Sequence, residues 1–291
     1  MSVLDDLVAG ALQDSQNREK IVSIDELRTN AKTQTPAKDA LQWLRSDTGI
    51  PVIAEIKRAS PSKGHLSDIT DPAKLAQEYE LGGASAISVL TEERVFKGSL
   101  QDLDDVRKAV SIPVLRKDFI VTDYQIFEAR AHGADLILLI VAALSDEQLG
   151  SLLKTTHELG MRALVETHTP QEVQRAVNAG AKIIGVNARN LKNLHVDVSK
   201  YQELADLIPE DVVKVAESGI FGSVEIEQYA RAGADAVLVG EAVATAQNHE
   251  LAVSRLVQAG NKVRESEQLP LSTHQGPYFG CFGGRHVPEA L

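Results

Sequence analysis

The feature that most constrains this fold is a repeat of short apolar runs separated by helix-like segments. The runs span residues 52–56, 86–90, 114–115, 136–141, 163–165, 183–186, 212–216 and 236–239. The segments between them place apolar residues at the 3.6-residue spacing of helices, over 71–81, 100–110, 123–132, 146–159, 170–179 and 224–232. Eight such βα units within roughly 200 residues predict an α/β fold, a closed (β/α)8 TIM barrel.

Glycines at the expected helix ends support this interpretation. Alanine follows Gly83, Gly133, Gly180 and Gly233, and methionine follows Gly160. Glycine suits the left-handed position just past a helix, so each marks a helix that ends and feeds the next strand. An open doubly wound sheet also alternates strands and helices, but no G-x-G-x-x-G motif follows the first strand here. The closed barrel is therefore favoured.

Ionisable residues stand at the ends of alternate predicted strands. Strands one, three, five and seven end in Lys57, Lys117, Glu166 and Glu217. In a barrel each layer of inward side chains comes from alternate strands, so these four are predicted to form one ring at the mouth. Glu55 lies two residues before Lys57, on the same face of its strand. A structural ion pair is the alternative for those two residues, and the ring argues against it.

The charge pattern predicts an anionic small-molecule ligand. The chain carries a net charge of −11, which argues against nucleic-acid binding. Cations nevertheless gather near strand ends, at Lys57, Arg58, Lys63, Arg116, Lys117 and Arg189. The alternative is that Arg58, Lys63 and Arg116 merely solvate loops. The loops after strands seven and eight predict a phosphate site, because Gly219 and Gly240 permit close backbone approach.

Composition sets further limits. With 291 residues and 43% apolar content, the chain can bury one large core with appendages. Cys281 is the single cysteine, so no disulfide forms within the chain, and a cytoplasmic location is expected. The first residues lack a signal-peptide pattern, and no apolar stretch reaches the ~20 residues that span a membrane. We therefore expect no membrane association.

Seven ordered motifs carry a resemblance to a known family. They are PVIAEIKRASPSKG, SVLTEERVFKGS, PVLRKDFIV, ALVETH, IIGVNARNL, VVKVAESGI and VLVGEAV, each at a predicted strand end. Residues 4–264 thereby resemble the indole-3-glycerol-phosphate synthases. The resemblance implies a carbon–carbon lyase (carboxy-lyase) of tryptophan biosynthesis, without cofactor or metal. Its substrate would be 1-(2-carboxyphenylamino)-1-deoxyribulose 5-phosphate, closed to indole-3-glycerol phosphate with loss of carbon dioxide and water.

The resemblance also implies catalytic roles. Lys117 takes the position of the acid that protonates the ketone oxygen during ring closure. Lys57 and Glu55 resemble the acid and the base of the later dehydration. Glu166 resembles the carboxylate that stabilises the electron-deficient nitrogen, and Glu217 one that orients or tunes the lysines.

Binding roles follow from the same resemblance. Asn187 and Arg189 are expected to address the substrate's hydroxyl and carboxylate ends, with Asn187 counted among the catalytic residues. Phosphate recognition is expected from Ser60, Lys63, Ser218, Gly219 and Gly240. The apolar wall for the aromatic ring is expected from Phe96, Phe119, Leu138 and Leu191, for which core packing is the alternative. Glu241 departs from a small serine-like residue, and we expect its carboxylate to point away from the phosphate.

Both ends of the chain fall outside the repeat. Residues 1–48 carry an apolar stripe at helical spacing that includes Leu4 and Leu7, and the resemblance implies that this helical extension lies over the barrel mouth. Packing on the barrel's outside is the alternative. The barrel is expected over 49–265. Residues 266–291 predict an irregular tail, similar to the extreme N-terminus of the tryptophan synthase β subunit. This similarity is expected either from a fused or mis-terminated reading frame or from a docking tail, and a docking tail would associate with other tryptophan-pathway enzymes.

Two other functions remain open at this stage. Another phosphosugar barrel enzyme, such as phosphoribosylanthranilate isomerase, would need a cysteine or aspartate base at the strand ends, where Lys57 and Lys117 stand instead. A non-catalytic scaffold for a pathway complex would not need the intact set of lysines and glutamates.

Overall fold

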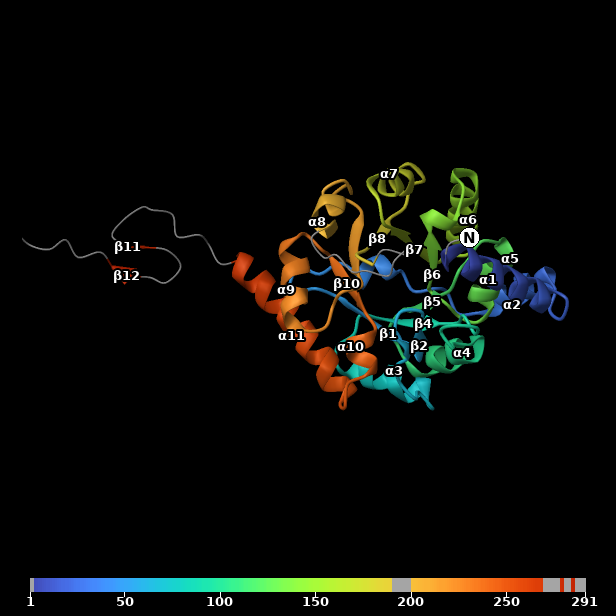
Figure 1. Ribbon diagram of the computed structural model, residues 1–291, viewed down its shortest axis with the longest axis horizontal. Coiled ribbons are helices and arrows are strands. Elements are labelled where there is room, and N and C mark those ends of the chain that lie inside the picture. The colour runs from blue at the N-terminus through green and yellow to red at the C-terminus, as the bar shows by residue number, and fades with distance from the viewer. Residues whose placement is uncertain (1–2, 190–199, 269–277, 280–283, 286–291) are drawn as a thin grey trace, which may run out of the picture.

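A closed parallel barrel forms the body of the protein (Figure 1). The computed structural model describes residues 3–189, 200–268, 278–279 and 284–285. Within these ranges the barrel strands are β1 (Val52–Ile56), β4 (Ala86–Leu90), β5 (Val114–Lys117), β6 (Leu136–Ile140), β7 (Arg162–Thr167), β8 (Ile183–Asn187), β9 (Val213–Glu217) and β10 (Ala236–Val239). Pairing of β1 with β10 closes the ring, so the predicted (β/α)8 barrel is confirmed.

Helices follow the strands and surround them (Figure 1). They are α3 (Pro72–Leu81), α4 (Leu100–Ala109), α5 (Asp123–Ala131), α6 (Asp146–Glu158), α7 (Pro170–Asn178), α8 (Lys200–Ala205), α9 (Ser223–Arg231), α10 (Glu241–Ala244) and α11 (His249–Gln268). A 3₁₀ turn, η2 (Val141–Ala143), follows β6. The predicted glycines at the helix ends have positive φ angles, from 74° at Gly160 to 93° at Gly83. These values confirm the left-handed helix ends expected from the sequence.

Two apolar layers result from the alternation of side chains along each strand. On β1, Val52 and Ala54 join the layer between strands and helices, whereas Ile53 joins the layer inside the barrel. The inner layer also contains Leu115 and Leu164, from β5 and β7. Because of this alternation, the polar residues at the strand ends point into the barrel mouth.

The N-terminal extension contacts both ends of the barrel. Its elements are α1 (Val3–Glu19), α2 (Ile24–Thr33) and the 3₁₀ turn η1 (Ala40–Gln42). Leu4 of α1 lines the pocket at the mouth. At the opposite end Asp39 pairs with Arg162, the first residue of β7, at 2.9 Å. α1 therefore reaches the mouth, whereas Asp39, just before η1, contacts the opposite end of the barrel.

The C-terminal helix is longer than expected. α11 continues to Gln268, so the boundary predicted at residue 265 falls inside a helix. Beyond it, β11 (Tyr278–Phe279) pairs antiparallel with β12 (Gly284–Arg285). This short ladder contrasts with the irregular tail predicted from composition. None of the helices in the described ranges is long and apolar enough to cross a membrane.

Candidate active site

A pocket opens at the carboxyl ends of the barrel strands, where α1 and the strand-end loops line it. The predicted residues that line it are Glu55, Lys57, Ser60, Phe96, Lys117, Phe119, Leu138, Glu166, Asn187, Arg189, Glu217, Ser218, Gly219 and Gly240. Lys63 is not among the lining residues, and Leu191 lies outside the described residues. The strand parity read from the sequence thus brings the expected groups into one cavity.

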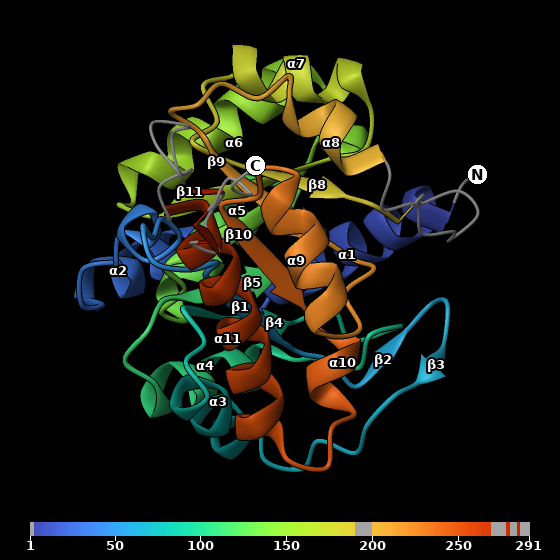
Figure 2. The same cartoon turned by 90° about the vertical axis from the view of Figure 1, so that its left-hand side faces the viewer.

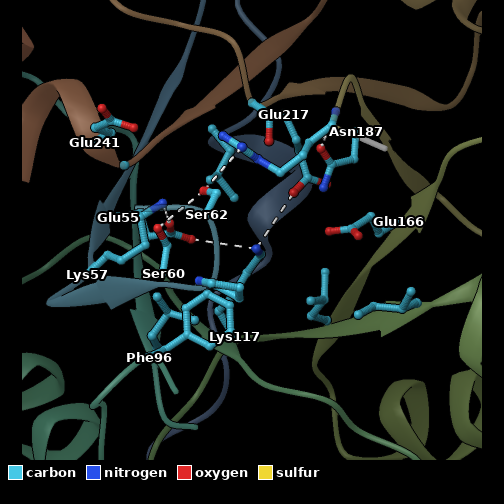
Figure 3. Close-up of a pocket in the computed structure, with 18 of the residues that line it drawn as sticks. Glu55, Lys57, Ser60, Ser62, Phe96, Lys117, Glu166, Asn187, Glu217 and Glu241 are labelled. Atoms are coloured by element: carbon cyan, nitrogen blue, oxygen red, sulfur yellow. Dashed lines mark hydrogen bonds and ion pairs between the residues drawn. The ribbon is translucent and has the colours of Figure 1, made fainter. Parts of the chain in front are cut away.

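Glu55 connects the two lysines (Figure 3). One carboxylate oxygen lies 2.9 Å from Lys57 Nζ, and the other lies 3.6 Å from Lys117 Nζ. Ser88 Oγ also donates to Glu55, at 3.3 Å. Burial alone would raise the pKa of Glu55, but the two lysines lower it to about 2. Burial opposes protonation of Lys117, yet Glu55, Glu217 and Glu166 raise its pKa above the ordinary value. Lys117 is therefore a protonated acid in the free protein.

Among the carboxyl groups of the pocket, Glu217 has the weakest stabilising contacts in the described part of the chain. Neither side-chain oxygen has a hydrogen-bond partner among the described residues, and Lys117 Nζ is 3.9 Å away. Burial raises the pKa of Glu217 well above its usual value, and the nearby Glu166 raises it further. A Cβ on Gly185 would come within 2.0 Å of Glu217 Oε1, so glycine makes room for this side chain. The arrangement favours a neutral Glu217.

Glu166 faces the same pocket from β7. Asn187 hydrogen-bonds to its carboxylate and accepts the backbone N–H of Arg189 at 3.0 Å. Burial opposes ionisation, but His168 and Lys117, with Asn187, lower the pKa of Glu166 to about 2. His168 was not predicted as a site residue, and its part in the ALVETH motif was the available signal.

The rim of the predicted phosphate site has strained backbone. Ser218 adopts a left-handed φ of 67°, uncommon for a residue with a side chain, and Gly219 follows at 73°. Tyr229 Oη donates to the carbonyl of Ser218 at 3.0 Å and holds this turn. A Cβ on Gly240 would lie 2.6 Å from Glu55 Oε1 and 2.7 Å from Lys57 Nζ. Glycine at 240 therefore makes room for the Glu55–Lys57 ion pair, a packing role that the sequence analysis did not identify.

Glu241 and Lys63 form an ion pair across the rim. Lys63 lies in the turn between β2 (Ala59–Ser60) and β3 (Gly64–His65), a hairpin beside α10 (Figure 2). Its Nζ is 3.1 Å from Glu241 Oε1. Glu241 is among the residues that line the pocket, and Lys63 offsets the charge of its carboxylate.

Two of the predicted cations belong to structural networks. Arg58 donates to the carbonyl of Ile69 at 3.0 Å and pairs with Asp102. Arg116 is fully buried and pairs with Asp118 and Glu128, each at 2.9 Å. Neither arginine lines the pocket. The alternation of side chains accounts for Arg116, because its neighbour Lys117 faces the mouth.

One side of the pocket is apolar. The rings of Phe96 and Phe119 lie 6.2 Å apart, with Leu138 also in the lining. Lining residues that the sequence analysis missed are Val3, Leu4, Leu7, Pro61, Ser62, Leu90, Asp118, Ile140, Ile220, Phe221, Leu238 and Val239. Strand parity could have identified Ile140, which lies two residues after Leu138. An apolar wall opposite paired charges suits an aromatic substrate with an anionic end.

Comparison with known proteins identifies relatives over most of the chain. A family model described as indole-3-glycerol phosphate synthase matches residues 4–256. Indole-3-glycerol phosphate synthase 1 of Streptomyces coelicolor is 58% identical over 260 residues, covering 89% of this chain and 96% of that protein. The Rhodococcus jostii indole-3-glycerol phosphate synthase is 57% identical over 260 residues, with the same coverage.

Solved structures with low sequence identity share the fold. 3-Hexulose-6-phosphate synthase from Salmonella typhimurium aligns with a TM-score of 0.61 at 16% identity, covering 74% of this chain and all of that one. Thiamine phosphate pyrophosphorylase from Pyrococcus furiosus aligns with a TM-score of 0.57 at 15% identity, covering 76% of this chain and 98% of that one. At this identity the likeness supports the barrel architecture alone.

Proposed function

The chain belongs to the indole-3-glycerol phosphate synthase family, and from that premise we propose how its barrel mouth performs the reaction. The protein acts as a carboxy-lyase on 1-(2-carboxyphenylamino)-1-deoxyribulose 5-phosphate, in tryptophan biosynthesis in the cytoplasm. The observation that carries the assignment of roles is the buried Glu55 carboxylate, which contacts both Lys57 and Lys117. A single carboxylate thereby connects two proton donors from different strands.

Ring closure is the first step, and Lys117 is its acid. The ring carbon that bears the carboxylate attacks the C2′ ketone, forming a carbon–carbon bond while the carbonyl π electrons move to oxygen. Lys117 donates a proton to that oxygen. The nearby Glu55, Glu217 and Glu166 stabilise the buried ammonium of Lys117. It therefore gives up its proton only to a strong base, such as the alkoxide that develops during ring closure. Carbon dioxide then leaves, and the bonding electrons restore the aromatic ring.

Dehydration is the second step, and Lys57 with Glu55 performs it. Lys57 protonates the hydroxyl, which leaves as water while the nitrogen lone pair forms an iminium. Glu55 then removes a proton from C1′, giving the indole. Glu55 is a weak base while both lysines are charged, and its pKa rises once Lys57 has released its proton. Two protons given and one taken match the one proton that decarboxylation consumes.

The remaining groups bind and orient the substrate. Glu166 stabilises the positive charge that develops on nitrogen, because it is the ionised carboxylate across the pocket from Glu55 (Figure 3). Asn187 and Arg189 contact the hydroxyl and carboxylate ends. Neutral Glu217 lies 3.9 Å from Lys117 Nζ and adds no negative charge to the site. The phosphate lies against Ser60, Ser218, Gly219 and Gly240, with Lys63 at the rim.

The test is formation of indole fluorescence on addition of the carboxyphenylamino substrate. Mass spectrometry should find indole-3-glycerol phosphate and carbon dioxide in equal amounts. Phosphoribosylanthranilate serves as the control substrate and should remain unconverted. If phosphoribosylanthranilate is isomerised and the proposed substrate remains unchanged, the proposed activity is wrong.

Rapid-quench sampling tests the order of steps. Lys57→Ala and Glu55→Gln should slow dehydration more than closure, because both act after the carbon–carbon bond forms. A decarboxylated species that retains its hydroxyl should then accumulate. If only unreacted substrate accumulates, Lys57 and Glu55 act in closure instead. Association with other tryptophan-pathway enzymes is a further part of this proposal, tested by co-purification with the C-terminal tail present or deleted.

A further inference from the structure

A buried histidine lies between two carboxylates directly behind the pocket. The His168 side chain is 12% exposed and follows β7. Its Nε2 lies 3.3 Å from Glu166 Oε1, and its Nδ1 lies 3.3 Å from Glu172 Oε2 in α7. No role described above uses His168. The geometry is a carboxylate–imidazole–carboxylate line that ends at a group in the active site.

Glu172 fixes the imidazole in place. Its Oε2 also accepts the backbone N–H of His168 at 2.8 Å, so one oxygen holds both the main chain and the ring. Thr169 caps the start of α7 by accepting the backbone N–H of Glu172 at 3.2 Å. These contacts hold Nε2 at 3.3 Å from Glu166 Oε1. Among the described residues Nε2 has no partner with hydrogen-bond alignment, so its contact with Glu166 is electrostatic.

Carboxylates on both sides favour the charged imidazolium. Burial lowers the pKa of His168, but Glu166 and Glu172 raise it to about 10. The histidine therefore remains a cation at neutral pH, buried against the wall of the pocket.

The His168 cation lowers the pKa of two carboxyl groups, Glu166 and Glu217, which repel each other when both are ionised. Glu166 is faced by Lys117 from β5, Asn187 from β8, Glu217 from β9 and His168 from its own loop. Lys117 acts on both glutamates and does not by itself decide which is ionised. His168 is 3.3 Å from Glu166, whereas Glu217 has no such contact. His168, together with the hydrogen bond from Asn187, therefore favours ionisation of Glu166 over that of Glu217.

We propose that His168, held by Glu172, is a positioning residue that keeps Glu166 ionised and leaves the proton on Glu217. This inference rests on the proposed function, because Glu166 must be anionic to stabilise the charge on the anilino nitrogen. Without the cation, Glu166 and Glu217 share a proton, and the fraction with Glu166 ionised falls as the pH falls.

The first test is the pH profile of kcat for His168→Asn, which retains a polar group without charge. Loss of a cation in contact raises a carboxyl pKa by about 1–3 units, so the acid limb should move upwards by that amount. We expect KM within about twofold of wild type, since His168 does not line the pocket. Glu172→Gln should move the limb in the same direction by less.

The matched control is His132→Asn. His132 also pairs with a carboxylate, Asp104, at 2.8 Å, but lies at the end of α5 and outside the pocket. This variant should leave the acid limb unchanged. A purely structural role for His168 would lower the melting temperature without moving the limb, and that result would overturn the proposal.

The second test needs no turnover, so it separates this inference from the proposed function. Carbon-13-labelled histidine would be titrated by NMR in the free protein, with His168→Asn identifying the resonance. His168 should stay protonated well above pH 7 and titrate lower in Glu172→Gln. If wild type fails to turn over the substrate, the proposed function fails while this result still decides the protonation state. Titration of His168 near pH 6.5 would overturn the inference.

Discussion

Two buried charge clusters lie on opposite faces of one strand, and they are built differently. On β5, Lys117 faces the mouth and contacts Glu55 and Glu217 at 3.6 and 3.9 Å. Its neighbour Arg116 faces the helices and pairs with Asp118 and Glu128, each at 2.9 Å. The arginine network is further joined by Thr91 Oγ1, which donates to Asp118 at 2.6 Å, and by Arg18 of α1, which pairs with Glu128 at 2.6 Å.

The difference separates structural from functional charge. In the arginine network short hydrogen bonds compensate the burial of each ion. In the mouth cluster the contacts of Lys117 are long, and Glu217 has no hydrogen bond within the described part of the chain. Such a cluster retains hydrogen-bonding groups that can bind a substrate and exchange protons with it. The arginine network should therefore carry stability, and the mouth cluster should carry catalysis.

The largest expected effect is the loss of turnover in Lys117→Ala. Removing a general acid lowers kcat by about 10²–10⁴-fold, while substrate binding and the melting temperature change little. Steady-state kinetics and thermal melting measure the two quantities. Lys182→Ala is the control, because Lys182 forms an exposed pair with Asp211. Near-normal turnover in Lys117→Ala would move the acid role to Lys57.

The reverse outcome is expected for Arg116→Met. It leaves Asp118 buried without its arginine and Glu128 with Arg18 alone, which should lower the free energy of unfolding by about 3–5 kcal/mol. Urea denaturation measures this loss. Lys154→Met is the matched control, since its pair with Glu158 is exposed and contributes at most about 1 kcal/mol.

A second variant keeps the Arg116 prediction testable if the first does not fold. Arg116→Met combined with Asp118→Asn removes the carboxylate charge whose ion pair is with Arg116, while Glu128 keeps Arg18, and should recover part of the lost stability. Equal stability of Arg116→Met and Lys154→Met would contradict the distinction between the two clusters.

Strand periodicity explains how much of this arrangement was predictable. It places Lys57, Lys117, Glu166 and Glu217 in one ring, because successive side chains alternate between the faces of a strand. The same rule would have placed Arg116 on the outer face, and the sequence analysis instead grouped it with the cations of the mouth.

Other features depend on contacts that strand periodicity cannot specify. The pairing of Lys63 with Glu241 joins loops far apart in the chain. The position of η1 at the far end of the barrel likewise depends on the pairing of Asp39 with Arg162. Helix length was misjudged at α11, where the polar sequence after Arg264 continues the helix to Gln268.

A smaller effect is expected from Glu217→Gln, and its sign depends on pH. The pKa of Glu217 is raised in the folded protein, so its protonation stabilises the fold below the unfolded pKa. That stability is lost as the pH rises through the folded pKa. Glutamine cannot ionise, so the variant should gain stability relative to wild type above about pH 4.5, by about 1.4 kcal/mol per unit of raised pKa.

Chemical denaturation at several pH values checks this prediction. Glu158→Gln is the control, because Glu158 is exposed on α6 and pairs only with Lys154 among the described residues. A stability difference between Glu217→Gln and wild type that stays constant with pH would show that folding does not raise the pKa of Glu217, which would contradict the prediction.

The smallest effect is expected from deleting residues 269–291. The residues that line the pocket all precede residue 242, and the family match ends at residue 256. The buried side chains of α11 run from Val253 to Val263, so truncation after Gln268 keeps them. The melting temperature and turnover should therefore stay close to full-length values. The competing idea is an apolar plug formed by Tyr278, Phe279 and Phe282, and burying one such ring contributes roughly 1.5–3 kcal/mol. A fall of several degrees on truncation would establish that plug, and the mouth and the arginine network would no longer account for stability and catalysis by themselves.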